Sequence, residues 1–254
     1  MMTLQEIDAY FHEILPIDEF AGIDSSRNGL QVSRQAQTIR RVAFAVDAAR
    51  QVFEEAADWG ADLLFVHHGI FWGREEVLRG AHYRRLFTLF QKDLALYAVH
   101  LPLDAHLSLG NNARMAAVLG LTDVEPFGLV RNVPIGVSGR LTEPLSLDEV
   151  QKRLFGPAFT PLAVLPFGRP RVESVGLISG GAPLEVDQAI RQGLDLYITG
   201  DANHVAYHRC RESGINAIFA GHYATETWGV RAVAEKLASD TGIETTFLDV
   251  PTGL

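Results

Sequence analysis

The chain has 254 residues, 47% of them apolar and 21% charged, which is enough for one large domain or two small ones with a normal core. Acidic residues outnumber basic ones by 31 to 22, and the net charge of -9 argues against nucleic acid or an anionic membrane as the main partner. A phosphorylated small molecule is compatible with this charge, because bound metal ions would reverse it locally. The single cysteine, Cys210, excludes an intrachain disulfide and a thiolate zinc cluster. A polar start and no long apolar run predict a cytoplasmic chain without a membrane span.

Helix and strand patterns alternate through the first half of the chain. Thr3 and Glu6 form a capping-box pattern ahead of a helix over 4–15. Strands are predicted at 41–46, 63–66 and 94–99, and helices at 48–59, 81–92 and 111–119. This alternation predicts right-handed crossovers and a largely parallel sheet.

The run Glu125-Pro126-Phe127-Gly128 interrupts the alternation and marks a predicted domain junction. Beyond it, strands are predicted at 133–141, 172–178, 194–199, 216–220 and 244–250, and helices at 146–155, 184–192, 202–212 and 225–238. We therefore predict an α/β fold of two α/β domains, each a mixed or mostly parallel sheet flanked by helices. The metal-site domain would comprise 1–125 plus 215–254, and the second domain 126–214.

Two histidines, His67 and His68, end an apolar strand and precede Gly69. Ligands of open α/β sheets bind beyond the carboxyl ends of strands, and neutral imidazole is a common metal ligand. Alternatively, one histidine packs at the strand end and the other is solvated.

A second strand end carries His100 and Asp104, separated by the stiffening Pro102. A third precedes His222 and Glu226, whose spacing of four puts both side chains on one helix face. Asp104 could instead cap a helix or turn, and Glu226 could simply favour a helix start.

All three strand ends would meet at one edge of a parallel sheet. Three histidines and two carboxylates suit two ions such as Fe, Mn, Zn or Co. Five ligands exceed the three that a catalytic zinc normally takes from protein. We therefore predict two divalent metal ions, with ligands His67, His68, Asp104, His222 and Glu226.

Other polar segments have weaker signals. Asp201, His204 and His208 follow a strand and could contact substrate or support the ligands, or be solvated. Asn28-Gly29 is typical of a hairpin turn. Ser179-Gly180-Gly181 could receive a phosphate at a helix start, although so short a glycine pair is unspecific.

The ordered set of motifs resembles the Nif-three-like dinuclear metal centre family, the GTP cyclohydrolase 1 type 2 homologues. The segments that carry the resemblance are Asn28-Gly29-Leu30-Gln31-Val32, Val66-His67-His68-Gly69, His100-Leu101-Pro102-Leu103-Asp104, Gly110-Asn111-Asn112, Thr199-Gly200-Asp201 and Gly221-His222-Tyr223 with Glu226. The resemblance implies the compact two-domain form without the inserted domain, assembled as a ring-shaped (toroidal) homohexamer. It also implies that the five predicted ligands hold the metals, with Glu226 bridging and His100 close by. The segment Asp24-Ser25-Ser26-Arg27 departs from the expected pattern.

Three functions are compatible with these residues. The first is a metal-dependent hydrolase that uses a metal-bridged hydroxide on a nucleotide-like substrate such as GTP, with His100 or His204 moving protons. The second is a non-catalytic hexameric scaffold or metal chaperone, and the third is a di-iron oxidoreductase. A proton-transfer group beside the metals and a substrate groove would favour the enzyme, because a metal store needs neither.

Overall fold

The computed structural model describes residues 1–74 and 76–254, which divide into two compact units. The first unit is Met1–Leu103 with Val230–Val250, and the second is Asp104–Gly229 with Pro251–Leu254. This division falls at other positions than the sequence-based boundaries near 125 and 215. Over the described ranges, no helix is long and apolar enough to cross a membrane.

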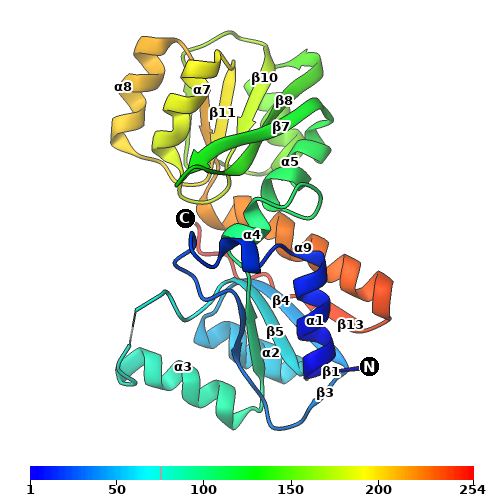
Figure 1. Cartoon of the computed structure of the whole chain (residues 1–254). Coiled ribbons are helices and arrows are strands. Elements are labelled where there is room, and N and C mark those ends of the chain that lie inside the picture. The colour runs from blue at the N-terminus through cyan, green and yellow to red at the C-terminus, as the bar shows by residue number, and fades with distance from the viewer. Residues whose placement is uncertain (75) are drawn as a thin grey trace. The chain divides into compact units, whose positions relative to one another are not determined.

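A mixed five-stranded sheet forms the centre of the first unit, in the order β13-β4-β5-β6-β2 (Figure 1). Strands β13, β4, β5 and β6 are parallel, and β2 pairs antiparallel with β6 at the edge. Their bounds are β2 Gly29–Val32, β4 Arg41–Asp47, β5 Leu63–His68, β6 Ala95–Ala98 and β13 Glu244–Phe247. A two-stranded ladder joins β1 Met2–Thr3 to β3 Thr38–Ile39.

Helices cover both faces of this sheet. They are α1 Leu4–Ile14, the 3-10 turn η1 Asp18–Phe20, α2 Arg50–Trp59, α3 Gly80–Gln91 and the short α4 Leu101–Asp104, which crosses the unit boundary. Helix α1 begins with the predicted capping box of Thr3 and Glu6, and Gly60 ends α2 in the left-handed conformation.

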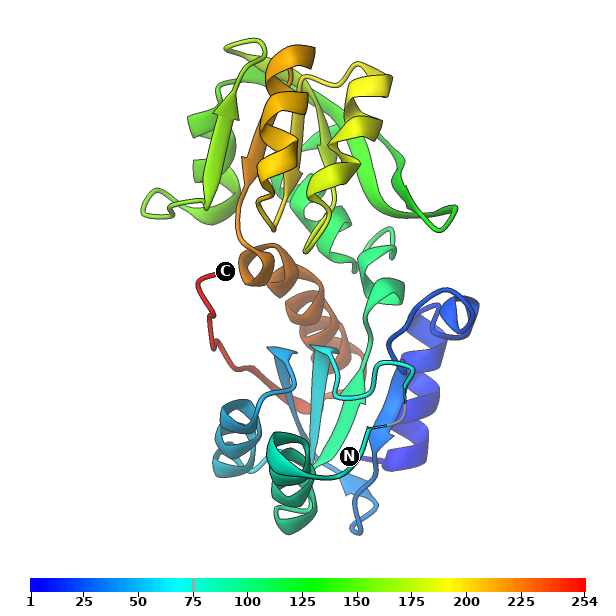
Figure 2. The same ribbon diagram turned by 90° about the vertical axis from the view of Figure 1, so that its left-hand side faces the viewer.

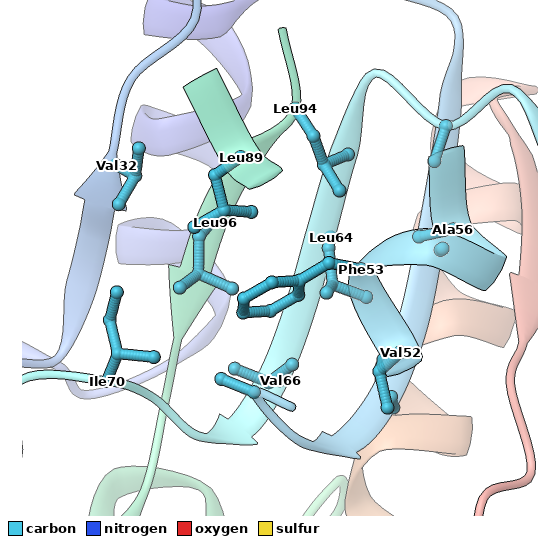
Figure 3. Packing of buried hydrophobic residues seen from close by; sticks show 14 of the residues in the cluster. Val32, Val52, Phe53, Ala56, Leu64, Val66, Ile70, Leu89, Leu94 and Leu96 are labelled. Atoms are coloured by element: carbon cyan, nitrogen blue, oxygen red, sulfur yellow. The ribbon is translucent and has the colours of Figure 1, made fainter. Parts of the chain in front are cut away.

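Alternating strand residues supply two cores. On one face, Phe53 of α2 packs with Leu64, Val66 and Leu96 of the sheet (Figure 3). On the other face, the rings of Phe11, Phe65 and Tyr97 lie 4.8–5.8 Å apart.

The second unit contains a six-stranded sheet in the order β7-β8-β10-β11-β12-β9. Strands β10, β11 and β12 are parallel in its centre, and the remaining pairs are antiparallel. Helices α7 and α8 cover one face, whereas α5 and α6 pack on the other (Figure 2). The bounds are α5 Asn111–Leu119, β7 Leu121–Val130, β8 Val133–Leu145, α6 Leu147–Phe155, β9 Ala163–Pro166, β10 Val172–Leu177, η2 Pro183–Glu185, α7 Val186–Gln192, β11 Leu196–Thr199, α8 His204–Ser213 and β12 Asn216–Phe219. Helix α9 His222–Thr241 begins in this unit and belongs to the first unit from Val230 onward.

The predicted fold class is confirmed, and local details are corrected. The hairpin turn predicted at Asn28-Gly29 is wrong, because Gly29 begins edge strand β2. The run Glu125–Gly128 lies inside β7, whose antiparallel pairing with β8 accommodates Pro126. The sheet of the second unit is mixed, as predicted, because β7, β8 and β9 extend its parallel centre by antiparallel pairing.

Candidate metal centre

Parallel strands of the first unit deliver polar side chains to one sheet edge. Asp47 ends β4 and pairs in register with His68, which ends β5 directly after His67. His100 follows β6, the next parallel strand. Because the carboxyl ends of parallel strands share an edge, three histidines gather there.

The buried His67 is fixed in one tautomer. Its Nδ1 lies 2.9 Å from the carbonyl oxygen of Val99, and its ring is fully buried. A carbonyl oxygen only accepts hydrogen bonds, so Nδ1 carries the proton and Nε2 carries the lone pair. This is the arrangement found in metal-binding histidines, whose second nitrogen donates to an oxygen.

His68 and His100 are oriented in the same way by carboxylates. His68 Nδ1 lies 2.9 Å from Asp47 Oδ1, and His100 Nδ1 lies 2.9 Å from Asp24 Oδ1. Ionised carboxylates also only accept, so both rings present Nε2.

Asp24 is held by several donors at once. It accepts from the backbone N–H groups of Ser26 and Leu101 and from the Asn28 amide, at 2.9–3.0 Å. Burial opposes ionisation of Asp24. The hydrogen bond to His100, the charge of His100 and the donors Asn28 and Ser26 outweigh burial and hold the pKa of Asp24 at about 2. Asn28 in turn accepts from the backbone N–H of His100 at 2.8 Å. The loop that departs from the family pattern therefore fixes His100.

The three rings are close enough to share a cation. Ring centroids of His67 and His68 lie 4.7 Å apart, and those of His67 and His100 lie 5.1 Å apart. One nitrogen from each of the three histidines lies within 4.8 Å of the others. Trp72 packs edge-on against His100 at 5.1 Å.

In the second unit, His222 and Glu226 lie one helical turn apart at the start of α9, after β12. The prediction that all three strand ends share one sheet edge is wrong, because β12 belongs to the six-stranded sheet of this unit. His222 Nε2 lies 3.2 Å from Glu226 Oε1, and His222 Nδ1 lies 2.9 Å from Asp201 Oδ1. The bond to Glu226 raises the pKa of His222 to about 9 against the effect of burial, helped by the charge of Glu226 and by Asp201. A cation would compete with this proton for Nε2.

Asp104 is buried in the same unit, and a carboxylate oxygen of it lies within 4.8 Å of one of Glu226. Its Oδ1 accepts from Ser179 Oγ at 2.7 Å and from Asn111 Nδ2 at 2.9 Å. Asn111 accepts from the backbone N–H of Gly229, and Asn112 from that of Ser179, both at 2.7 Å. Asn111 thus holds the carboxylate of Asp104, the last residue of α4, directly, and Asn112 holds the backbone of Ser179, whose hydroxyl donates to that carboxylate.

Glycine at position 180 lets the backbone approach the buried Glu226. Gly180 has φ +65°, and a Cβ there would lie 2.2 Å from Glu226 Oε1 and 3.2 Å from His222 Nε2. Neither the conformation nor the distance suits a larger residue. The predicted phosphate loop 179–181 therefore packs against the candidate ligands.

The donor set fits divalent transition metals. The first unit offers imidazole nitrogens and the second offers an imidazole nitrogen with two buried carboxylates, and donors of both kinds suit Fe, Mn, Zn or Co. All four histidines are oriented through Nδ1 by an oxygen acceptor. Such supporting bonds fix the orientation of metal ligands and raise their basicity.

Six of the seven predicted site residues lie in these two groups. The first unit gathers His67, His68 and His100, and the second gathers Asp104, His222 and Glu226. His204 lies at the exposed start of α8, where its ring neighbours His208 at 6.5 Å.

The sequence singled out Asp201, which orients His222, but not the residues that orient the other histidines. Asp47 directly follows a predicted strand, so its position was a usable signal. The bonds of Asp24 and Asn28 to His100, and the bond of His67 to Val99, gave no such signal. Their partners lie 32 to 76 residues apart in the chain.

Proteins of other organisms match this chain over its whole length. A Treponema pallidum (strain Nichols) protein named GTP cyclohydrolase 1 type 2 homolog is 45% identical over 286 residues, covering 100% of both chains. An Archaeoglobus fulgidus protein of the same name is 42% identical over 253 residues, again covering 100% of both.

Solved structures of similar proteins have the same fold. A Thermus thermophilus protein has a TM-score of 0.89 at 40% identity, covering 100% of both chains. Reduced HcgD from Methanocaldococcus jannaschii has a TM-score of 0.84 at 26% identity, covering 98% of both. Residues 2–253 match the family described as Duf34/NIF3 (NGG1p interacting factor 3), and the chain belongs to this family, as its ordered motifs predict.

Proposed function

We propose that the protein binds two divalent metal ions through His67, His68, Asp104, His222 and Glu226. The observation that carries this proposal is the commitment of Nδ1 to an oxygen acceptor in His67, His68 and His222. Histidines that only stabilise a core have no need of one shared tautomer. In His67 and His68 this leaves Nε2 as an electron-pair donor, and in His222 a cation would have to displace the proton that Nε2 shares with Glu226.

We further propose that the protein is a metal-dependent hydrolase acting on a nucleotide-like substrate. Bound divalent ions would supply a nucleophile by lowering the pKa of coordinated water towards neutrality. His100 is our first candidate for proton transfer, because Asp24 fixes its ring beside His67. The exposed His204 is the second. The names of the relatives, GTP cyclohydrolase 1 type 2 homolog, support GTP as the first substrate to test.

The His100–Asp24 pair favours an enzyme over a metal chaperone or scaffold. A store needs ligands, but it does not need a buried carboxylate that orients a further histidine beside His67. The metal content of the native protein and its reactivity towards oxygen would separate a hydrolase from a di-iron oxidoreductase.

Metal analysis tests the ligand assignment. Protein purified without added metal should contain up to two equivalents of metal per chain, and Glu226→Ala should lose at least one while the chain still folds. His208→Ala, which changes an exposed histidine on α8, is the matched control. Unchanged metal content in Glu226→Ala would show that Glu226 is not a ligand.

Formate release from GTP tests the reaction. Protein loaded with Mn, Zn, Fe or Co should release formate slowly, and chelator treatment should abolish it. His100→Ala should lower the rate about 100-fold or more with unchanged metal content, as expected for loss of a proton-transfer group. No formate with any metal would refute GTP ring opening, and metal loss in His100→Ala would make His100 a ligand instead.

We also propose a ring-shaped homohexamer that acts in the cytoplasm. Helix α3 exposes Tyr83, Phe87 and Phe90 by 49–64% at helical spacing. An apolar stripe of this kind is typical of an interface between subunits. Light scattering coupled to gel filtration should give a mass six times that of the chain, and Phe87→Glu should lower it.

A further inference from the structure

A pocket of about 520 Å³ lies wholly within the first unit, next to His68. It is formed by the end of β5 and the loop after it, the start of α2, and the first two turns of α3. Its chemically active lining residues are Asp47, Arg50, His68, Trp72, Arg84 and Arg85. Its volume is that of a small-molecule site.

Two arginines of α3, against the single carboxylate of Asp47, leave this pocket with a net positive charge. Arg85 Nε is buried and has no hydrogen-bond partner among the residues that the structure describes. Within the same residues, no acidic side chain forms an ion pair with Arg84 or Arg85. The third arginine, Arg50, is paired with Glu54 at 3.1 Å, and Asp47 is engaged by His68. An anion is the ligand that would satisfy the two guanidinium groups.

The helix starts around the pocket add to this preference. Ala48, Ala49 and Arg50 line it where α2 begins, and Ala81 lines it in the first turn of α3. The N-cap residues of both helices, Ala49 and Arg79, provide no side-chain acceptor. Backbone N–H groups and the positive ends of two helix dipoles therefore favour negative charge at this position.

Trp72 connects the pocket to the histidines. Its ring lies 6.0 Å from His68 and 5.1 Å from His100, and its Nε1 donates to the Gly69 carbonyl at 3.0 Å. That bond fixes an aromatic ring that lines the pocket and contacts the candidate proton-transfer residue, His100. A molecule with an anionic end and a bulky other end could thus contact both regions.

We propose that this pocket binds the phosphate or polyphosphate group of a phosphorylated substrate, on Arg84 and Arg85. The reacting part of that substrate would extend past Trp72 towards His68 and His100. The phosphate pocket depends on the proposed function in one respect only, that the reaction takes place at His68 and His100. The arginine pocket itself would bind phosphate whether or not metals are present.

Binding of inorganic tripolyphosphate, measured by calorimetry, tests the proposal directly. Chelator-treated wild-type protein should bind it, and Arg84→Gln/Arg85→Gln should weaken binding about 100-fold, since each arginine makes a charge-assisted hydrogen bond. Arg191→Gln, an exposed change on α7, is the control and should leave the affinity unchanged. Arg84 is exposed, so the single Arg84→Gln variant should fold and lose about 10-fold. Equal affinities in wild-type and double-variant protein would overturn the proposal.

A comparison of GTP with guanosine identifies the source of the phosphate. In wild-type protein GTP should bind at least about 10-fold more tightly than guanosine, and the difference should vanish in the double variant. If tripolyphosphate binding depends on the arginines but GTP shows no advantage, the pocket takes a phosphate ester that is not a nucleotide. Failure of the metal proposal would appear as unchanged metal in Glu226→Ala, a readout that is independent of the arginines.

Discussion

Replacing Gly180 with alanine tests whether the backbone of the second unit positions Glu226. The new Cβ would lie 2.2 Å from Glu226 Oε1, whereas ordinary contacts begin at 3.4 Å, so the carboxylate must move by roughly 1 Å. A side chain can make this movement at a cost of about 1 kcal/mol in rotamer energy. The positive φ adds about 1–2 kcal/mol for any residue with a Cβ.

Gly193→Ala is the matched control for this variant. Gly193 lies in the same unit with φ +68°, but a Cβ there meets no atom within 4 Å. Both variants should therefore lose about 1–2 kcal/mol in free energy of unfolding, with the Gly180 variant about 1 kcal/mol worse. Only Gly180→Ala should weaken metal binding, by about 10–100-fold, because a displaced ligand loses its coordination geometry.

Two measurements separate these effects. Urea denaturation of chelator-treated protein gives the stability change, and metal analysis after dialysis at stepped free-metal concentrations gives the affinity. Equal metal affinities of the two alanine variants would refute the reasoning, because Glu226 would then not need its present position.

Three further predictions follow from single contacts. Asp47→Ala and Asp201→Ala should each lower metal affinity about 10–100-fold without unfolding the chain, as measured by metal titration and circular dichroism. Thr3→Ala removes the capping-box acceptor of α1 and should cost about 1 kcal/mol in urea denaturation; an unchanged midpoint would mean that the cap is irrelevant. Burial raises the pKa of the Cys210 thiol to about 11, so at pH 8 its alkylation should be roughly 100-fold slower than that of a free thiol; comparable rates would contradict its burial.

Local signals explain why much of the fold was predictable. The helix at Asn111–Leu119 was predicted with its observed bounds, because Gly120 ends it in the left-handed conformation. The helix after Ser146 begins with the predicted capping box to Glu149. The buried parallel strands form continuous apolar runs, which the sequence displays directly.

The edge strands and the contacts that orient the histidines were harder to predict from the sequence. Strand β2 begins at an Asn-Gly pair that is typical of turns, and only its pairing with β6 makes it extended. Strand β9 contains Pro166 and joins the sheet by antiparallel pairing with β12, which no local pattern reveals. Asn28 and Asp24 acquire their roles only when the fold brings His100 to them.

The orientation of His68 and that of His222 have a common structural origin. Asp47 precedes His68 by 21 residues, and Asp201 precedes His222 by 21 residues, with hydrogen bonds of 2.9 Å in both pairs. In each case a ten-residue helix, α2 or α8, connects two adjacent parallel strands. Neighbouring strands lie about 4.8 Å apart, so residues at the ends of consecutive strands come within hydrogen-bonding distance. In each unit, therefore, a strand–helix–strand crossover places an aspartate at or just beyond the end of one strand and a histidine at or just beyond the end of the next. The aspartate binds Nδ1 of that histidine, so Nε2 points away from the aspartate. The two pairs share no local motif, but an Asp and a His at the ends of consecutive predicted strands would have revealed both.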